Sequence, residues 1–374
     1  LLEENRDGGI NAMSPASEVW MSGTILRTTG PNEQGVNGMG IVAFDGASLE
    51  ISSCLLDQNT ALGAFVLDPG TVVRLTDTVI RDTRADVAGG LGIGLEADFG
   101  SRVFLDQCLI AGNPAAGIVV NGPDTEADIS ASVVRDTRSS DLMSAGAGLQ
   151  VSAGSTASLD RCLLQGNTGA GVVAEDPGSW LRLTRTIVQE TEPYENSDRG
   201  VGLQVQWGAE AEIAGCLFQG NVEAGIYSMS PDSRIDVSDS IVGDTRLNPL
   251  GEYGVGLTVL GGAAAIDRTR LQANHTAGIW VANPGTSVTV TDAEVRHTIK
   301  GSSGAVGGAG DGVLVSHGAQ LALTSSVLVG NDRTGAFFSS SSGSVSGCTI
   351  TLNKSYGLAI DSCHACLDFG DLAN

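Results

Sequence analysis

Aromatic residues are scarce in this chain of 374 residues, in which Phe, Trp and Tyr together make up 4%. So low a content does not suit a globule with one large core, because aromatic side chains supply much of the buried area of such cores. The 52 glycines suit a different design. Glycine favours tight turns, so the composition indicates many short strands separated by turns.

Positive charge is also scarce, with 20 Lys and Arg against 43 Asp and Glu and a formal net charge of −23. Nucleic acid is therefore not expected as a partner, because binding it requires a positive surface. Polyanionic sugars are disfavoured unless a cation bridges them or arginines cluster locally. No apolar run approaches the roughly 18 residues of a membrane-spanning helix, so no transmembrane segment is predicted.

One sequence pattern returns about every 54 residues, for example LEISSCLLDQNTALGAFV at 49–66 and VFLDQCLIAGNPAAGIVV at 103–120. Its cysteines are Cys54, Cys108, Cys162 and Cys216. Its asparagines are 54, 54, 54, 53 and 57 residues apart: Asn59, Asn113, Asn167, Asn221, Asn274 and Asn331. A second pattern lies between the copies, as in VRLTDTVIRDTR at 73–84, and is followed by a variable loop. One period therefore holds a short coil and a long coil.

Each coil carries three short runs of alternating apolar residues, bounded by Gly, Asn, Asp or Pro. Such runs cannot bury an inward face alone, but coils stacked about 4.8 Å apart can share one core. The sequence therefore predicts an all-β, parallel β-helix of about thirteen coils. The repeated asparagines fall at a sharp bend, where they are predicted to form a structural ladder.

The repeat spacing resembles that of the pectate-lyase-like superfamily, and most closely the large, secreted, Gly-rich β-helix repeat proteins of myxobacteria. This resemblance implies a right-handed helix and a secreted or cell-surface location. The superfamily includes lyases, hydrolases, epimerases and adhesins, so the resemblance leaves the activity open.

The repeat array is predicted to span residues 1–342, followed at 343–374 by a last short coil and a C-terminal cap. Leu1–Asn5 matches Leu55–Asn59, so the array is expected to begin in mid-repeat as a piece of a longer one. The cap contains Cys363 and Cys366, for which a local disulfide is favoured over a zinc site, because only His364 offers a further ligand nearby.

An acidic position recurs at the entrance to the long-coil loops, as Asp82, Asp136, Glu190 and Asp244. The favoured interpretation is a turn with solvated charge, because Asp-Thr pairs bond readily to the local backbone. The alternative is a groove, with Asp136, Glu190, Asp244 and Arg138 as catalytic candidates. In that case calcium could bind at Glu190, Glu192 and Asp198.

A row of outward-facing residues is predicted on the third strand of successive coils in the C-terminal half. Aromatic rings alternate there with polar groups, an arrangement that suits sugar rings. The candidate ligand-binding residues are Tyr227, Trp280, Phe337, Gln204 and Thr258. The competing interpretation is that loops or another chain cover this face.

The leading functional hypothesis is a non-enzymatic, secreted or cell-surface rod that needs no cofactor and contacts a polysaccharide or a cell-surface component. The motifs of polygalacturonases and alginate epimerases are absent, and uniform repetition favours a structural unit over a single active centre. The alternative is a polysaccharide lyase, glycoside hydrolase or epimerase acting on an extracellular polysaccharide.

Overall fold

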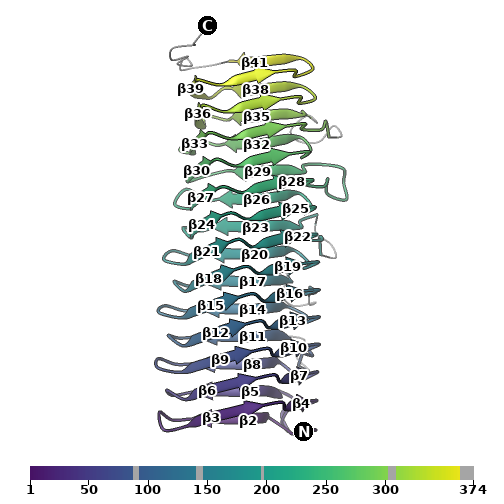
Figure 1. Cartoon of the computed structure of the whole chain (residues 1–374), viewed down its shortest axis with the longest axis vertical. Coiled ribbons are helices and arrows are strands. Elements are labelled where there is room, and N and C mark those ends of the chain that lie inside the picture. Colours follow the sequence, from purple (N-terminus) through teal and green to yellow (C-terminus); the bar gives the residue numbers. More distant parts are fainter. Residues whose placement is uncertain (87–91, 140–145, 195–197, 302–308, 363–374) are drawn as a thin grey trace. The chain divides into compact units, whose positions relative to one another are not determined.

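The computed structural model describes residues 1–86, 92–139, 146–194, 198–301 and 309–362. These residues form 41 β-strands (Figure 1). No helix among them is long and apolar enough to cross a membrane. Strands of six, five and three residues follow one another in a fixed order with few exceptions, and the three kinds number 14, 13 and 14. The prediction of an all-β chain with about thirteen coils is confirmed.

The chain divides into two compact units, the first built mainly from Leu1–Ile187 and the second from Val188–Pro193 and Asp198–Asn374. In each unit the strands of one kind pair in parallel and form one sheet. We call these the long-strand, medium-strand and short-strand sheets. The predicted division at residue 342 stays a prediction, and Cys363, His364 and Cys366 lie outside the described residues.

In the first unit each sheet contains seven strands. The long-strand sheet contains β2 (Gly8–Met13), β5 (Met39–Phe44), β8 (Leu62–Leu67), β11 (Ile93–Asp98), β14 (Ala116–Asn121), β17 (Ala147–Ser152) and β20 (Ala170–Glu175). The medium-strand sheet contains β3 (Glu18–Ser22), β6 (Ser48–Ser52), β9 (Val72–Thr76), β12 (Arg102–Asp106), β15 (Glu126–Ser130), β18 (Thr156–Asp160) and β21 (Trp180–Thr184). The short-strand sheet contains β1 (Leu2–Glu3), β4 (Ile25–Arg27), β7 (Leu55–Asp57), β10 (Val79–Arg81), β13 (Leu109–Ala111), β16 (Val133–Arg135) and β19 (Leu163–Gln165).

In the second unit the long-strand sheet contains β23 (Val201–Gln206), β26 (Ala224–Met229), β29 (Val255–Val259), β32 (Ala277–Ala282), β35 (Asp311–Ser316), β38 (Thr334–Ser339) and β41 (Tyr356–Asp361). The medium-strand sheet contains β24 (Glu210–Ala214), β27 (Arg234–Ser238), β30 (Ala263–Asp267), β33 (Ser287–Thr291), β36 (Gln320–Thr324) and β39 (Ser342–Ser346). The short-strand sheet contains β25 (Leu217–Gln219), β28 (Ile241–Gly243), β31 (Arg270–Gln272), β34 (Glu294–Arg296), β37 (Val327–Val329) and β40 (Thr349–Thr351). Strand β22 (Ile187–Gln189) contains residues assigned to both units.

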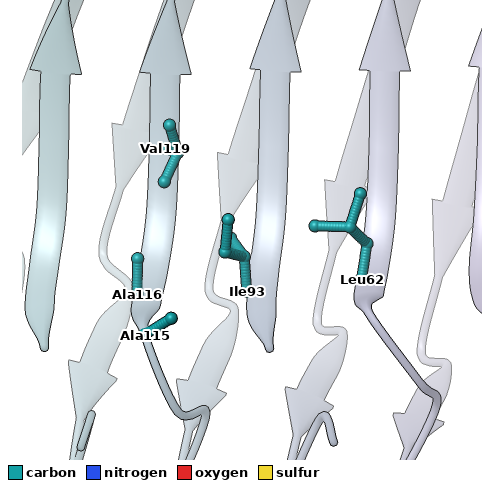
Figure 2. Packing of buried hydrophobic residues seen from close by; sticks show 5 residues of the cluster. All are labelled: Leu62, Ile93, Ala115, Ala116 and Val119. Atoms are coloured by element: carbon teal, nitrogen blue, oxygen red, sulfur yellow. The ribbon is translucent and has the colours of Figure 1, made fainter. Parts of the chain in front are cut away.

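The core consists of apolar side chains stacked in register from coil to coil. Ala64, Leu95 and Ile118 are aligned on neighbouring strands, and all three are fully buried. A smaller apolar cluster lies at the start of the same strands, where Leu62, Ile93 and Ala116 are neighbours (Figure 2). Stacking thus buries side chains that no single coil could remove from water.

The asparagine bend is a buried corner in which each Asn bonds the backbone of the preceding coil. Asn167 is 1% exposed. Its Oδ1 accepts from the Thr137 N–H at 3.2 Å, and its Nδ2 donates to the Val134 carbonyl at 3.1 Å. From Asn59 to Asn331 the asparagines therefore do not stack directly on one another, because a threonine occupies the equivalent place in each intervening coil. In the next coil Asn353 does follow directly, and its Oδ1 accepts from Asn331 Nδ2 at 2.8 Å.

The other two corners also contain small polar side chains. At the first, a buried Cys alternates with Ser or Thr from Cys54 to Ser240, and the Cys108 N–H donates to Ser132 Oγ at 3.0 Å. At the second, Thr125 Oγ1 accepts from the Gly100 N–H at 2.8 Å. These side chains satisfy backbone groups that a bend would otherwise leave unpaired. Burial raises the pKa of the Cys108 and Cys162 thiols to about 11, so both stay protonated and unreactive at neutral pH.

On the long strand of the coil before each asparagine, a glycine is required by close approach between coils. A Cβ on Gly148 would lie 2.6 Å from the Gly171 carbonyl oxygen and 2.7 Å from Asn167 Nδ2. Both distances are too short for an unstrained contact, so a larger residue would push the coils apart. The repeated Asn and Gly are thus two parts of one packing unit.

Candidate functional site

The recurring acidic residues occupy a strained turn, whatever else they do. Asp136, Glu190 and Asp244 have φ of 56°, 55° and 53°, in the left-handed region. Short polar side chains tolerate these angles better than apolar ones. This backbone requirement is a structural reason for acidic residues to recur at this position.

Two of the catalytic candidates, Asp136 and Arg138, line one pocket of about 470 Å³ in the first unit. Arg81, Asp82 and Arg135 lie in the same pocket. The pocket is open, and Arg135 Nε is 3.6 Å from Asp136 Oδ2. The other two candidates, Glu190 and Asp244, belong to the second unit.

The three residues proposed for calcium do not form a metal-binding cluster. Glu192 Oε1 pairs with Arg246 Nη2 at 2.6 Å. Glu190 packs over Gly220, on which a Cβ would lie 3.8 Å from the Glu190 Cγ. Across the described ranges no group of three or more His, Cys, Asp or Glu side chains converges as a metal site.

The predicted aromatic row has the register that alternation suggests. Tyr227 is aligned with Thr258 and Thr258 with Trp280 on neighbouring strands, and Gln204 and Phe337 lie farther along the same sheet. An open binding face does not result, however. Tyr227 is 8% exposed and Thr258 only 2%.

Residues at the start of the long strands cover this row. The Arg199 guanidinium lies 5.7 Å from the centre of the Tyr227 ring. Tyr253 stacks on Trp280 with ring centres 6.3 Å apart, and Arg333 lies 4.9 Å from the centre of Phe337. The structure therefore fits the interpretation in which loops cover this face. The insertions precede the long strands and border this sheet.

A more open surface lies on the medium-strand sheet of the first unit, where the sequence analysis placed no site. A groove of about 440 Å³ crosses β6, β9, β12, β15 and β18. We call it the Phe104 groove. Its polar and aromatic lining comprises Glu50, Arg74, Thr76, Phe104, Asp106, Asp128, Ser130, Ser158 and Asp160.

The outward row through this groove runs in register from Arg74 to Phe104 and on to Asp128 and Ser158. The Arg74 guanidinium lies 4.3 Å from the centre of the Phe104 ring, a cation–π contact. The half-buried ring is thus held beside hydrogen-bonding groups of both kinds: carboxylates that accept, and hydroxyl and guanidinium groups that donate.

The signal for this groove was present in the sequence. The runs VVRLT, RVFLD and ADIS alternate inward Val, Leu, Ala and Ile with outward Arg, Phe and Asp. The alternation of inward and outward residues, which predicted the row on the long strands, also predicts an outward row on the medium strands.

Comparisons with known proteins agree with this architecture. Residues 19–188 match the family described as "Right handed beta helix region". No curated protein matches the chain. Vag8, solved in complex with C1 inhibitor, is 16% identical with a TM-score of 0.58, over 90% of this chain and 78% of that one.

Two further structures are more distant. The periplasmic alginate epimerase AlgG is 12% identical with a TM-score of 0.44, over 85% of this chain and 73% of that one. A mannuronic-acid-specific polysaccharide family 6 lyase from human gut microbiota is 10% identical with a TM-score of 0.45, over 84% and 77%. None of these similarities supports the myxobacterial likeness, and at 16% identity the match to Vag8 bears on the fold alone. The parallel sheets and this match show that the chain has the right-handed parallel β-helix fold.

Proposed function

We propose that this protein is a secreted or cell-surface β-helix that binds a polysaccharide without cleaving it. The observation that carries the proposal is the Phe104 groove, in which an aromatic ring lies among carboxylate, hydroxyl and guanidinium groups. Sugars have apolar ring faces and hydroxyl edges, so this mixture complements them.

Structural uses of the repeated polar residues favour binding over catalysis. The repeated Asn and Cys take part in the hydrogen bonds at the bends between strands, and the recurring acids occupy a left-handed turn. None of these roles leaves a positioned acid and base on either side of a substrate bond, as glycoside hydrolysis requires. The proposed location follows the resemblance to secreted β-helix proteins.

A polysaccharide-active enzyme is the second candidate, and the pocket at Asp136 and Arg138 is the observation that favours it. A carboxylate beside a guanidinium could assist proton transfer on a polysaccharide. Incubation with neutral and acidic polysaccharides, followed by chromatography of the products, separates the two candidates. New reducing ends or unsaturated products that disappear in Asp136→Asn would overturn the binding-only function.

The binding proposal is tested by screening the full chain on an array of plant, algal and bacterial polysaccharides. We expect retention on at least one of them. Phe104→Ala is expected to weaken it by about tenfold or more, because removal of an aromatic anchor commonly has an effect of this size. The matched control is Phe99→Ala, which removes a 58% exposed ring from the same unit outside the groove. Equal loss in both variants, or no retention anywhere, contradicts the proposal.

A further inference from the structure

Aromatic side chains occur at regular intervals on the outward face that contains the Phe104 groove. Trp20 lies on β3, Phe104 on β12 and Trp180 on β21, all in the medium-strand sheet of the first unit. Three strand steps separate each ring from the next. At about 4.8 Å a step, the rings recur about every 14 Å along the stacking direction.

Each outer ring shares one feature with the central one. Trp20 is 72% exposed and shares the outward row of Glu50, Arg74 and Phe104. Trp180 begins its strand, and the Arg182 guanidinium lies 5.7 Å from its ring centre. The pairing of an arginine with an aromatic ring thus occurs at Phe104 and again at Trp180.

We propose that this face is a track for a single chain of a neutral polysaccharide, which lies along the stacking direction from Trp20 through Phe104 to Trp180. The inference rests on the proposed function and adds the class of ligand, its direction and its two outer contacts. Separate aromatic platforms joined by polar positions suit a repeating chain, because each platform can take one sugar ring while hydroxyl groups bond between them.

The charge of the groove selects neutral sugars over acidic ones. Glu50, Asp106, Asp128 and Asp160 line it together with Arg74. Arg161 and Arg185 pair with Asp160 from outside the lining, which leaves three carboxylates beside one arginine in the groove. Uronate or sulfate groups would meet this excess of carboxylates, and the formal net charge of −23 adds to the repulsion. Sugar hydroxyls, in contrast, can donate to carboxylate oxygens.

The same face is a poor match for a protein partner. Charged residues separate its three rings, and Glu50 and Arg74 lie between Trp20 and Phe104 in the outward row. Protein interfaces usually have a contiguous apolar core from which charged residues are depleted. A saccharide does not need such a core.

Oligosaccharide length provides the test. Neutral gluco-, xylo- and manno-oligosaccharides, from disaccharide to decasaccharide, are titrated calorimetrically into the full chain. We expect affinity to rise with length in at least one series. Trp20→Ala and Trp180→Ala are expected to weaken the longest oligomers several-fold and the shortest little, whereas Phe104→Ala weakens every length. Phe99→Ala serves as the control and is expected to match the wild type.

The outcomes separate the track from the proposed function. If Phe104→Ala abolishes binding while both Trp variants match the wild type at every length, the groove binds sugar and the track is wrong. Binding of oligouronates in preference to every neutral series also overturns the inference while leaving polysaccharide binding intact. If no oligosaccharide or polysaccharide binds, both proposals fail.

Discussion

Glu223, like Glu96, is a largely buried carboxyl side chain whose surroundings do not suit its ordinary charge. It is 8% exposed, and its Oε2 has no hydrogen-bond partner in the described structure. Its Oε1 lies 3.8 Å from Arg199 Nε, beyond hydrogen-bond distance. Burial raises the pKa of Glu223 from 4.5 to about 7; Arg199 partly opposes this rise and Asp198 adds to it.

This raised pKa predicts a pH-dependent stability. Between about 4.5 and 7 the folded chain retains a proton that the unfolded chain has lost, so the stability contributed by Glu223 falls as pH rises through this range. Glu223→Gln removes the charge and should raise the melting temperature at pH 8, with a gain on the order of 2 kcal/mol. Below pH 4 the variant and the wild type should differ little.

Melting curves followed by circular dichroism across this pH range check the prediction. Glu210→Gln is a suitable control, because Glu210 is exposed in the same unit. The buried-acid interpretation fails if Glu223→Gln destabilises the chain at pH 8, or if the control produces the same change.

At the scale of elements, the asparagine corner allows a comparison between two neighbouring side chains. Asn167→Ala would leave the Thr137 N–H and the Val134 carbonyl without their partner, both in a buried corner. We expect a loss of about 2–4 kcal/mol, since each buried unpaired group costs about 1–3 kcal/mol. Thr137→Val should be neutral or stabilising, because the buried Thr137 hydroxyl has no hydrogen-bond partner in the described structure.

Chemical denaturation of the two variants measures this difference. The result that contradicts the corner's role is a Thr137→Val variant that loses as much stability as Asn167→Ala. A small loss in Asn167→Ala alone would mean that water enters the corner and replaces the amide.

The corner also explains why the fold could be predicted from the sequence. Asn167 and its equivalents return at a nearly constant step, because each bonds the coil before it and packs against a glycine such as Gly148. In a one-dimensional repeat, a contact that recurs from coil to coil appears in the sequence as a constant spacing between the residues that make it. The predicted outward direction of Tyr227 and Trp280 followed from the same regularity.

The openness of the aromatic row could not be predicted in the same way. Arg199, Tyr253 and Arg333 cover it, and each comes from a connection whose sequence varies from coil to coil. The position that a variable connection adopts depends on its tertiary contacts, and the repeat pattern does not specify these contacts. The Phe104 groove was not predicted for another reason: its residues lie on the medium strands, whereas the predicted aromatic row lies on the long strands.

At the scale of the whole molecule, the dominant physical feature is negative charge. The 43 acidic residues exceed the 20 basic ones, and even the arginines largely pair with acids, as Arg102 does with Glu126 at 3.1 Å. A surface of this kind attracts cations and repels polyanions over distances of about a Debye length. Any ligand of the Phe104 groove must bind despite this field or be indifferent to it.

Ionic strength therefore distinguishes the classes of ligand. If the ligand is a neutral polysaccharide, its affinity should change less than about twofold between 50 mM and 500 mM NaCl, because screening acts on charges that the ligand does not carry. An anionic ligand would bind more tightly as salt screens the repulsion, and a cationic one more weakly. Calorimetric titrations of the retained polysaccharide at several salt concentrations measure this dependence. Phe104→Ala, run in parallel, shows how much of the remaining signal comes from outside the groove, and a strong salt dependence confined to the wild type would contradict a neutral ligand.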